Sequence, residues 1–223
     1  LSLKVGIDRI SKIALEFGLG EYYFQNLFSS SNGLIPNRKW KKDRYNRAWT
    51  KSDTIVAGIG QGFTLSTPLQ LVVMMSRIAT DGSKINPKII KDNNSRREVK
   101  SFEKINNVSI DAFNLIKKGM FNAVNDPSGT AYFSRMISNK LFAGKTATSQ
   151  VRRISMAERE VGILKNEELP REQRDHALFA GYYPHIKPEF SFVIVVEHGG
   201  SGSKSAAPIA KSICNELQSN KII

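Results

Sequence analysis

Three segments in the last third of the chain are typical of β-strands and follow one another before a closing helix. They are LFAGKTATSQV (141–151), HALFAGYYP (176–184) and FSFVIVVEHGG (190–200). The third is apolar on both faces, so we expect it to be the central strand. Strands with short direct links that lead into a helix predict an α/β fold of the α+β type, an antiparallel sheet packed by helices.

Two helices are expected in the first 81 residues. The first covers 7–18, with Asp8 as its N-cap and Gly18 as its stop. Its apolar face would consist of Ile7, Ile10, Ala14 and Phe17. The second begins at Thr67-Pro68, a favourable N-cap and N1 pair, and it is apolar nearly all round, which predicts burial. Residues 20–56 between the two helices are typical of a loop.

Three further helices follow. Ser109 is expected to cap a helix that ends at the turn NDPSGT, with an apolar face of Phe113, Ile116, Met120 and Val124. Within the charged segment 152–175, Ser155 and Glu158 form a capping box for a short helix. The closing helix begins near Ser205 and should bury one side, made of Ile209, Ile213 and Leu217.

The net charge of +13 favours anionic partners such as nucleic acid, acidic lipid or anionic cell-wall polymer. No block of like charge is long enough for a binding tail, so cations spread over a solvated surface are the simpler explanation. The segment RKWKKDRYNRAW (38–49) combines cations with aromatic rings but carries no nucleic-acid-binding motif. We interpret it as an exposed loop, and we expect no nucleic acid partner.

Several motifs lack the context that a ligand site would need. GIGQG (58–62) has neither phosphate-loop spelling, so we interpret it as a tight backbone passage in which glycine permits positive φ. His176 and His198 stand at strand ends and are assigned structural roles, and no metal-ligand spacing occurs. Cys214 is the single cysteine, which excludes an internal disulfide. We therefore expect no metal and no cofactor.

A Ser-x-x-Lys pair on a helix can place a lysine amine beside a serine nucleophile. Ser101–Lys104 lies in a polar stretch and Ser201–Lys204 in a Gly/Ser turn, so we interpret neither as catalytic. Lys145-Thr146-Ala147-Thr148 is more informative, because a strand would place both threonine hydroxyls on one face and Lys145 on the other. Beside a cleft, such an edge strand could bind a carboxylate and an oxyanion.

Taken in order, these pieces resemble the penicillin-binding protein transpeptidases, and within them the elongation-specific penicillin-binding protein 2 branch. The resemblance extends from near residue 5 to about residue 215, and the segment 152–175 is similar to an insertion of that branch. The carrying blocks are GIGQGFTLSTPLQL (58–71), SGTA (128–131), GKTATSQVRRIS (144–155), RDHALFAGYYP (174–184) and VVEHGGSGSKSAAPIAK (195–211), together with the loop GLIPNRKW (33–40).

The family uses three motifs, Ser-x-x-Lys, Ser-x-Asn and Lys-Thr-Gly. Only the third is present here, as Lys145-Thr146-Ala147, with Ala147 in the place of glycine. The order of motifs in the family places the other two upstream of Leu1, and the spelling Ser30-Ser31-Asn32 is out of order. The resemblance therefore implies that residues 1–223 are the C-terminal portion of one transpeptidase domain, without its N-terminal part and without the nucleophile.

The resemblance also implies roles for the third motif. Lys145 and the backbone N–H of Thr148 would be catalytic, through electrostatics and the oxyanion hole. Thr146 and Thr148 would bind the terminal carboxylate of the substrate beside Ala147. The parent enzyme would be a serine D,D-transpeptidase that cross-links D-Ala-D-Ala stem peptides of peptidoglycan, binds β-lactams and works with the elongation machinery at the periplasmic face of the inner membrane.

The missing motifs leave an alternative open. The chain could be a non-catalytic remnant that binds anionic cell-wall polymer or a partner protein. In either case we expect the isolated chain to be inactive. We also expect it to be poorly soluble, because the family's sheet includes N-terminal strands whose absence would leave a strand edge exposed.

Overall fold

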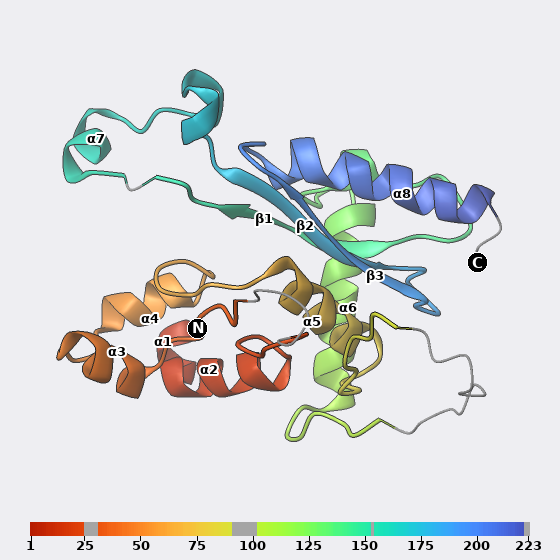
Figure 1. Cartoon of the computed structure of the whole chain (residues 1–223). Helices are drawn as coiled ribbons and strands as arrows, with labels where there is room; N and C mark the ends of the chain where they lie inside the picture. The colour runs from red at the N-terminus through yellow and green to blue at the C-terminus, as the bar shows by residue number, and fades with distance from the viewer. Residues whose placement is uncertain (25–30, 91–101, 153, 221–223) are drawn as a thin grey trace. The chain divides into compact units, whose positions relative to one another are not determined.

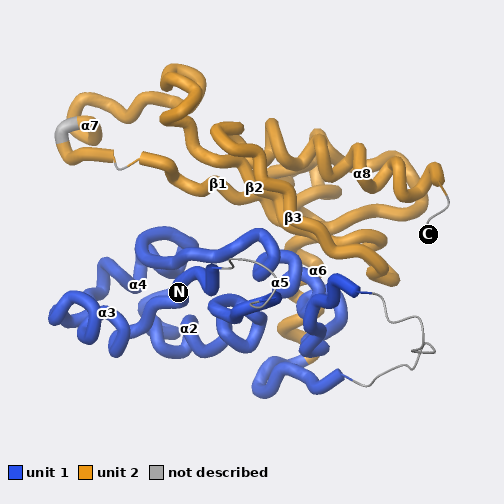
Figure 2. The backbone as a smooth tube through the Cα atoms, in the orientation of Figure 1, with its two compact units in different colours: residues 1–109 blue, residues 110–223 orange. Residues whose placement is uncertain are grey.

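The computed structural model describes residues 1–24, 31–90, 102–152 and 154–220. Contacts within the chain divide it into two compact units, unit 1 (Leu1–Ser109) and unit 2 (Ile110–Ile223), which Figure 2 distinguishes by colour. Unit 1 is built from helices and connecting loops, whereas unit 2 contains the three-stranded sheet (Figure 1). No helix among the described residues combines the length and the apolarity needed to span a membrane.

Unit 1 begins with α1 (Ser2–Val5) and α2 (Ile7–Glu16), and the second corresponds to the helix expected at 7–18. Ile7 and Phe17 are buried, as its apolar face predicts. The expected N-cap is wrong, because Gly6 holds that position and Asp8 lies in the first turn. The Asp8 carboxylate instead accepts a hydrogen bond from the backbone N–H of Arg38, which joins α2 to a segment 30 residues away.

The loop expected over 20–56 contains two helices, α3 (Arg38–Tyr45) and α4 (Lys51–Ala57), so that interpretation is wrong for these two segments. The exposed loop expected at 38–49 is likewise mostly helix. The sequence signal for both helices is an N-terminal capping residue, because neither helix has apolar residues at helical spacing. Asn37 Oδ1 accepts from Trp40 N at 2.8 Å, and Thr50 forms a capping box with Asp53.

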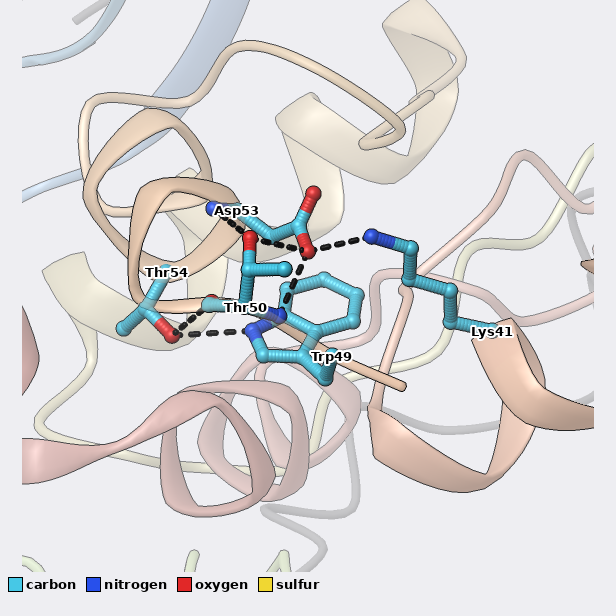
Figure 3. A network of polar contacts seen from close by, with 5 residues as sticks. All are labelled: Lys41, Trp49, Thr50, Asp53 and Thr54. Carbon is cyan, nitrogen blue, oxygen red and sulfur yellow. Dashed lines mark hydrogen bonds and ion pairs between the residues drawn. The ribbon is translucent and has the colours of Figure 1, made fainter. Parts of the chain in front are cut away.

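A partly buried ion pair connects α3 to α4 (Figure 3). The Lys41 ammonium binds the Asp53 carboxylate and lies 5.7 Å from the ring centres of both Trp49 and Phe63. Trp49 Nε1 in turn donates to Thr54 Oγ1 at 2.8 Å. Burial opposes ionisation of Asp53, but the hydrogen bonds from Lys41 and Thr50 outweigh it and lower the pKa of this carboxyl.

The helix expected after Thr67-Pro68 is confirmed as α5 (Pro68–Ala79). Thr67 caps it through a capping box with Gln70, and the preceding glycines Gly60 and Gly62 adopt positive φ. The helix is buried, but two of its buried side chains are polar. Gln70 Nε2 donates to the carbonyls of Glu21 and Asn32, and Arg77 Nη1 donates to the carbonyl of Glu16, all within 3.0 Å. These bonds hold the surrounding loops on α5.

Unit 2 begins with α6 (Ile110–Asn125), which follows Ser109 directly and ends at the expected turn. Phe113, Met120 and Val124 are buried, whereas Ile116 is exposed. The charged segment 152–175 contains α7 (Met156–Val161), with the expected Ser155–Glu158 capping box. Two short 3-10 turns follow, η2 (Asn166–Glu168) and η3 (Arg171–Gln173).

The sheet consists of β1 (Ala143–Ser149), β2 (His176–Tyr183) and β3 (Phe190–Val196), antiparallel and in the order β1-β2-β3. The α+β expectation is confirmed, but the expected position of the third strand is wrong. β2 is central among the described strands and β3 lies at an edge. Gly181 explains why the central strand is less apolar, since a Cβ there would lie 2.5 Å from the carbonyl oxygen of Ala143. Small residues let the neighbouring strand approach.

The chain closes with a π-helical turn, η4 (Gly202–Ala206), and α8 (Ala207–Ser219), which runs along one face of the sheet (Figure 1). The expected apolar face is wrong for two of its three residues, because Ile209 is 41% and Ile213 39% exposed. Leu217 does pack against the core. The residues that α8 buries fully are Ala207, Ala210 and Cys214. These small side chains allow the helix axis to approach the aromatic side chains of the sheet.

Candidate functional site

The Lys145–Thr148 motif lies in the middle of β1, and β1 pairs with no described strand other than β2. Thr146 is opposite Phe179 and Thr148 is opposite Ala177. The predicted strand is therefore confirmed, and β1 lies at an edge of the described sheet. An edge strand of this kind presents one row of backbone groups to a potential ligand.

Side chains of the motif alternate between the two faces of β1, so both threonines point away from the face of Lys145. Lys145, Ala147 and Thr148 are exposed, and Thr146 is half-buried. The Lys145 ammonium donates to the carbonyl oxygen of Thr146 at 2.6 Å. The two threonine hydroxyls share one face of β1 and are suited to donating to a carboxylate, whereas the Lys145 ammonium lies on the other face.

Thr130 completes this group, and the sequence analysis did not select it. Its Oγ1 lies 3.1 Å from Thr146 Oγ1. The turn that carries it folds back onto the end of α6, where Ala131 N donates to the carbonyl of Ala123 at 2.8 Å. Gly129 permits this approach, since a Cβ there would lie 2.4 Å from the carbonyl oxygen of Asn122. The SGTA block was the available signal, but nothing in its spelling indicates a contact with β1.

Ala147 adopts an ordinary strand conformation with negative φ, so its methyl group causes no backbone strain. The close approach at this position comes instead from Gly202 in η4. A Cβ on Gly202 would lie 2.7 Å from the carbonyl oxygen of Ala147 and 2.5 Å from that of Leu178. The turn η4, which leads into α8, therefore packs directly against the backbone of the motif at Gly202.

Of the two Ser-x-x-Lys spellings, only Ser201–Lys204 is described in full, and its two side chains bind other groups. Lys204 binds the Glu167 carboxylate at 3.0 Å, and Ser201 Oγ contacts Ser203 Oγ at 3.0 Å. Lys104 donates to the carbonyl of Thr80 at 2.9 Å, and its nominal partner Ser101 lies outside the described residues.

The out-of-order Ser-Ser-Asn spelling begins at Ser30, which also lies outside the described residues. Its other two members make local bonds. Ser31 Oγ accepts from the backbone N–H of Gly33 at 3.1 Å, and the carbonyl of Asn32 accepts from Gln70 Nε2 at 2.9 Å. These contacts shape the loop that packs against α5.

The histidines at the strand ends have the structural roles expected of them. His176 Nδ1 accepts from the backbone N–H of His198 at 2.9 Å, and the two rings meet edge to face at 4.8 Å. His198 Nδ1 contacts the carbonyl of Arg174. Within the part of the chain that the structure describes, no cluster of three or more His, Cys, Asp or Glu side chains could hold a metal ion.

Comparison with known families gives a match over nearly the whole chain. The sequence profile of the "Penicillin binding protein transpeptidase domain" matches residues 1–215. The chain is 32% identical over 218 residues to the peptidoglycan D,D-transpeptidase MrdA of Haemophilus influenzae, covering 96% of this chain and 33% of that protein. It is also 32% identical over 219 residues to MrdA of Acinetobacter baumannii, covering 94% of this chain and 31% of that protein. The chain thus spans about a third of the length of these relatives.

Solved structures agree in fold. Penicillin-binding protein PBP2 of Helicobacter pylori, in complex with MreC, matches all of this chain and 38% of that one, with a TM-score of 0.83 and 28% identity. PBP2 of Pseudomonas aeruginosa, in complex with WCK 5153, matches 95% of this chain and 42% of its own chain, with a TM-score of 0.76 and 31% identity. The chain belongs to the penicillin-binding protein transpeptidase family.

Proposed function

We propose that residues 1–223 are the C-terminal part of the transpeptidase domain of a peptidoglycan D,D-transpeptidase. The observation that carries this proposal is the Lys145–Thr148 motif on an edge strand, with Thr130 beside Thr146, in a chain whose family profile spans residues 1–215. The segment 152–175, which contains α7, is proposed as an insertion between the motif strand and β2.

In this proposal the motif forms the wall of the cleft that binds the end of a stem peptide. The hydroxyls of Thr146 and Thr148 donate to the terminal carboxylate of D-Ala-D-Ala, and Lys145, on the opposite face of β1, contributes positive charge to the electrostatics of the acyl site. The backbone N–H of Thr148 stabilises the oxyanion that forms on the penultimate carbonyl. Thr130 fixes the Thr146 hydroxyl through their 3.1 Å contact.

The nucleophile of the reaction is proposed to come from a serine upstream of residue 1. Its Oγ attacks the carbonyl carbon of the penultimate D-Ala, and the terminal D-Ala leaves as the amine after accepting a proton. The resulting acyl-serine is then attacked by an amine of a neighbouring stem peptide, which restores the hydroxyl. A β-lactam acylates the same serine, and its carboxylate occupies the place of the terminal carboxylate.

The proposed location is the periplasmic face of the inner membrane, where peptidoglycan precursors are cross-linked. The H. pylori PBP2 that this chain resembles was solved with MreC, which supports a partner from the elongation machinery. Neither a cofactor nor a metal takes part in this chemistry.

A non-catalytic role remains the second candidate, and the cations of α3 and its following turn favour it. Lys39, Lys42, Arg44 and Arg47 are exposed and form no ion pair with a described residue. Such a surface could bind an anionic cell-wall polymer. Fluorescent penicillin separates the two candidates. The longer protein should be labelled covalently if the first is right, and should remain unlabelled if it is a non-catalytic remnant.

A further inference from the structure

Unit 2 contains a cavity of about 320 Å³ near the start of β1, away from the Lys145–Thr148 motif. It is formed by the middle of α6, the turn that precedes β1 and the turn between β2 and β3. Its apolar lining includes Phe121, Leu141, Pro184 and Ile186. Leu141 precedes Lys145 by four residues, which corresponds to roughly 13 Å along a strand. This cavity is therefore separate from the proposed substrate wall.

His185 contributes an imidazole to the lining of this cavity, which also contains Asn139, Lys140, Lys187 and Glu189. Its backbone N–H donates to the carbonyl of Leu141 at 2.7 Å, and its ring lies 4.6 Å from the ring of Phe121. Nδ1 contacts Tyr182 Oη at 3.2 Å, while Nε2 has no hydrogen-bond partner among the described residues. Burial, together with the charge of Lys117, lowers the pKa of His185 and so favours the neutral imidazole.

The opening of the cavity is strongly basic. Lys140 and Lys187 line it, and neither forms an ion pair with a described residue. An adjoining cavity of about 270 Å³ shares Phe121, His185 and Ile186 and adds Lys117 and Lys118 to its lining. Glu189 is the single acidic residue among the residues that line the two spaces.

We propose that this cavity binds a small amphipathic anion, a flat apolar body that carries one carboxylate or similar group. The apolar lining would remove the body from water, and a volume of this size suits a ligand of about one or two rings. The lysines would attract the anionic group, and His185 Nε2 could bind it or a neighbouring polar atom. A neutral analogue would lose the charge interaction, and a cationic analogue would be repelled.

The probe for this site is 4-benzoylbenzoate, a photoreactive aromatic carboxylate, used at low protein concentration with adducts mapped by mass spectrometry. Its matched control ligand is 4-benzoylbenzamide, which has the same rings without the charge. We expect adducts on the peptides that contain Phe121 or Ile186, with about tenfold more labelling by the carboxylate, which corresponds to about 1.4 kcal/mol of charge interaction.

Three variants complete the test. The double variant Lys140→Glu/Lys187→Glu should lower labelling by the carboxylate about tenfold and leave the amide unchanged. Ile186→Trp should reduce labelling by both probes, because the larger side chain occupies the opening. Ile186 is 85% exposed, so the fold should tolerate this change. Lys211→Glu on α8, which does not line either cavity, is the control for a charge reversal elsewhere on unit 2 and should behave as the wild type.

The proposal is wrong if the carboxylate and the amide label equally, if neither gives an adduct at the cavity, or if Ile186→Trp leaves labelling unchanged. These outcomes do not involve the penicillin reaction. The cavity and the proposed transpeptidase function can therefore fail independently.

Discussion

The hydroxyl oxygens of Thr130 and Thr146 lie 3.1 Å apart and join the turn after α6 to the middle of β1. The two threonines are 16 residues apart in the sequence, and this contact brings them together at one site. It also gives Thr146 a fixed orientation before any substrate arrives. Preorganised donors of this kind are worth more to catalysis than mobile ones, because no reorganisation accompanies the reaction.

Replacing Thr130 by Val in the longer protein should therefore slow its acylation by penicillin. The loss of one hydrogen bond, about 1 kcal/mol, corresponds to about a fivefold decrease in the second-order rate constant. Thr130→Ser retains the hydroxyl and is the matched control. An unchanged rate in the Val variant would show that this contact does not orient Thr146 for the reaction.

Substitutions at Ala147 and at Gly202, which packs against the backbone of Ala147, should lower the free energy of unfolding by very different amounts. Ala147→Gly should lower the free energy of unfolding by only about 0.5–1 kcal/mol, since it adds backbone freedom in a strand. Gly202→Ala should cost several times more, because its new Cβ would meet two carbonyl oxygens that cannot move independently. Urea denaturation of both variants measures the difference. Equal losses would contradict the close packing of η4 on β1.

The partly buried ion pair of Lys41 and Asp53 should make unit 1 sensitive to acid. The folded state lowers the pKa of Asp53, so its contribution to stability is complete above the unfolded-state pKa near 3.8 and is lost as the pH falls through the lower folded-state value. Asp53→Asn leaves Lys41 without its charged partner and should destabilise the protein by about 1–3 kcal/mol at pH 7, between the cost for a surface pair and that for a buried one. It should also flatten the stability curve below pH 4.

The matched control is Asp8→Asn, since the Asp8 side chain is 56% exposed and pairs with an exposed Arg38. This change should cost less than about 1 kcal/mol. Melting curves between pH 3 and pH 7 compare the two variants. Similar losses in both would mean that the Lys41–Asp53 pair is no stronger than a surface pair.

The buried face of α8 can be tested by two substitutions with opposite expectations. Ala210→Leu adds volume to a fully buried position and should destabilise unit 2 by about 1–3 kcal/mol. Ile213→Asn lies on an exposed position and should change the stability by less than about 0.5 kcal/mol. Urea denaturation would give the reverse order if the face expected from the isoleucines were the buried one.

Much of this fold could be predicted from local sequence signals. The strands, α5 and α7 were identified because turn residues or capping residues mark their ends. Such signals can be read from the sequence because a cap involves residues within four positions of one another. Lys145, Thr146, Ala147 and Thr148 were found for the same reason, as one continuous stretch. The structure places them on an edge strand of the described sheet, whereas their chemical roles remain proposals.

Features that depend on tertiary packing could not be predicted. Residues 209 and 213 looked like a core face because isoleucine is apolar, but the close approach of α8 to the sheet selects Ala210 and Cys214 instead. β3 was expected to be central because it is the more apolar strand. β2 is central instead, and it contains Gly181 because its neighbouring strand leaves no room for a side chain there. The contact of Thr130 with Thr146 likewise depends on how the turn after α6 folds back.

The most direct test of the central claim is the mass of benzylpenicillin adducts, measured in parallel on residues 1–223 and on the longer protein that includes the upstream residues. We predict no adduct on the isolated chain and a single adduct on the longer protein, at a serine upstream of residue 1. Lys145→Ala should slow that acylation about a hundredfold, whereas Lys211→Ala should not change it. An adduct on any serine of residues 1–223, with Ser201 the first to examine, or undiminished acylation of the Lys145→Ala variant, would contradict the account.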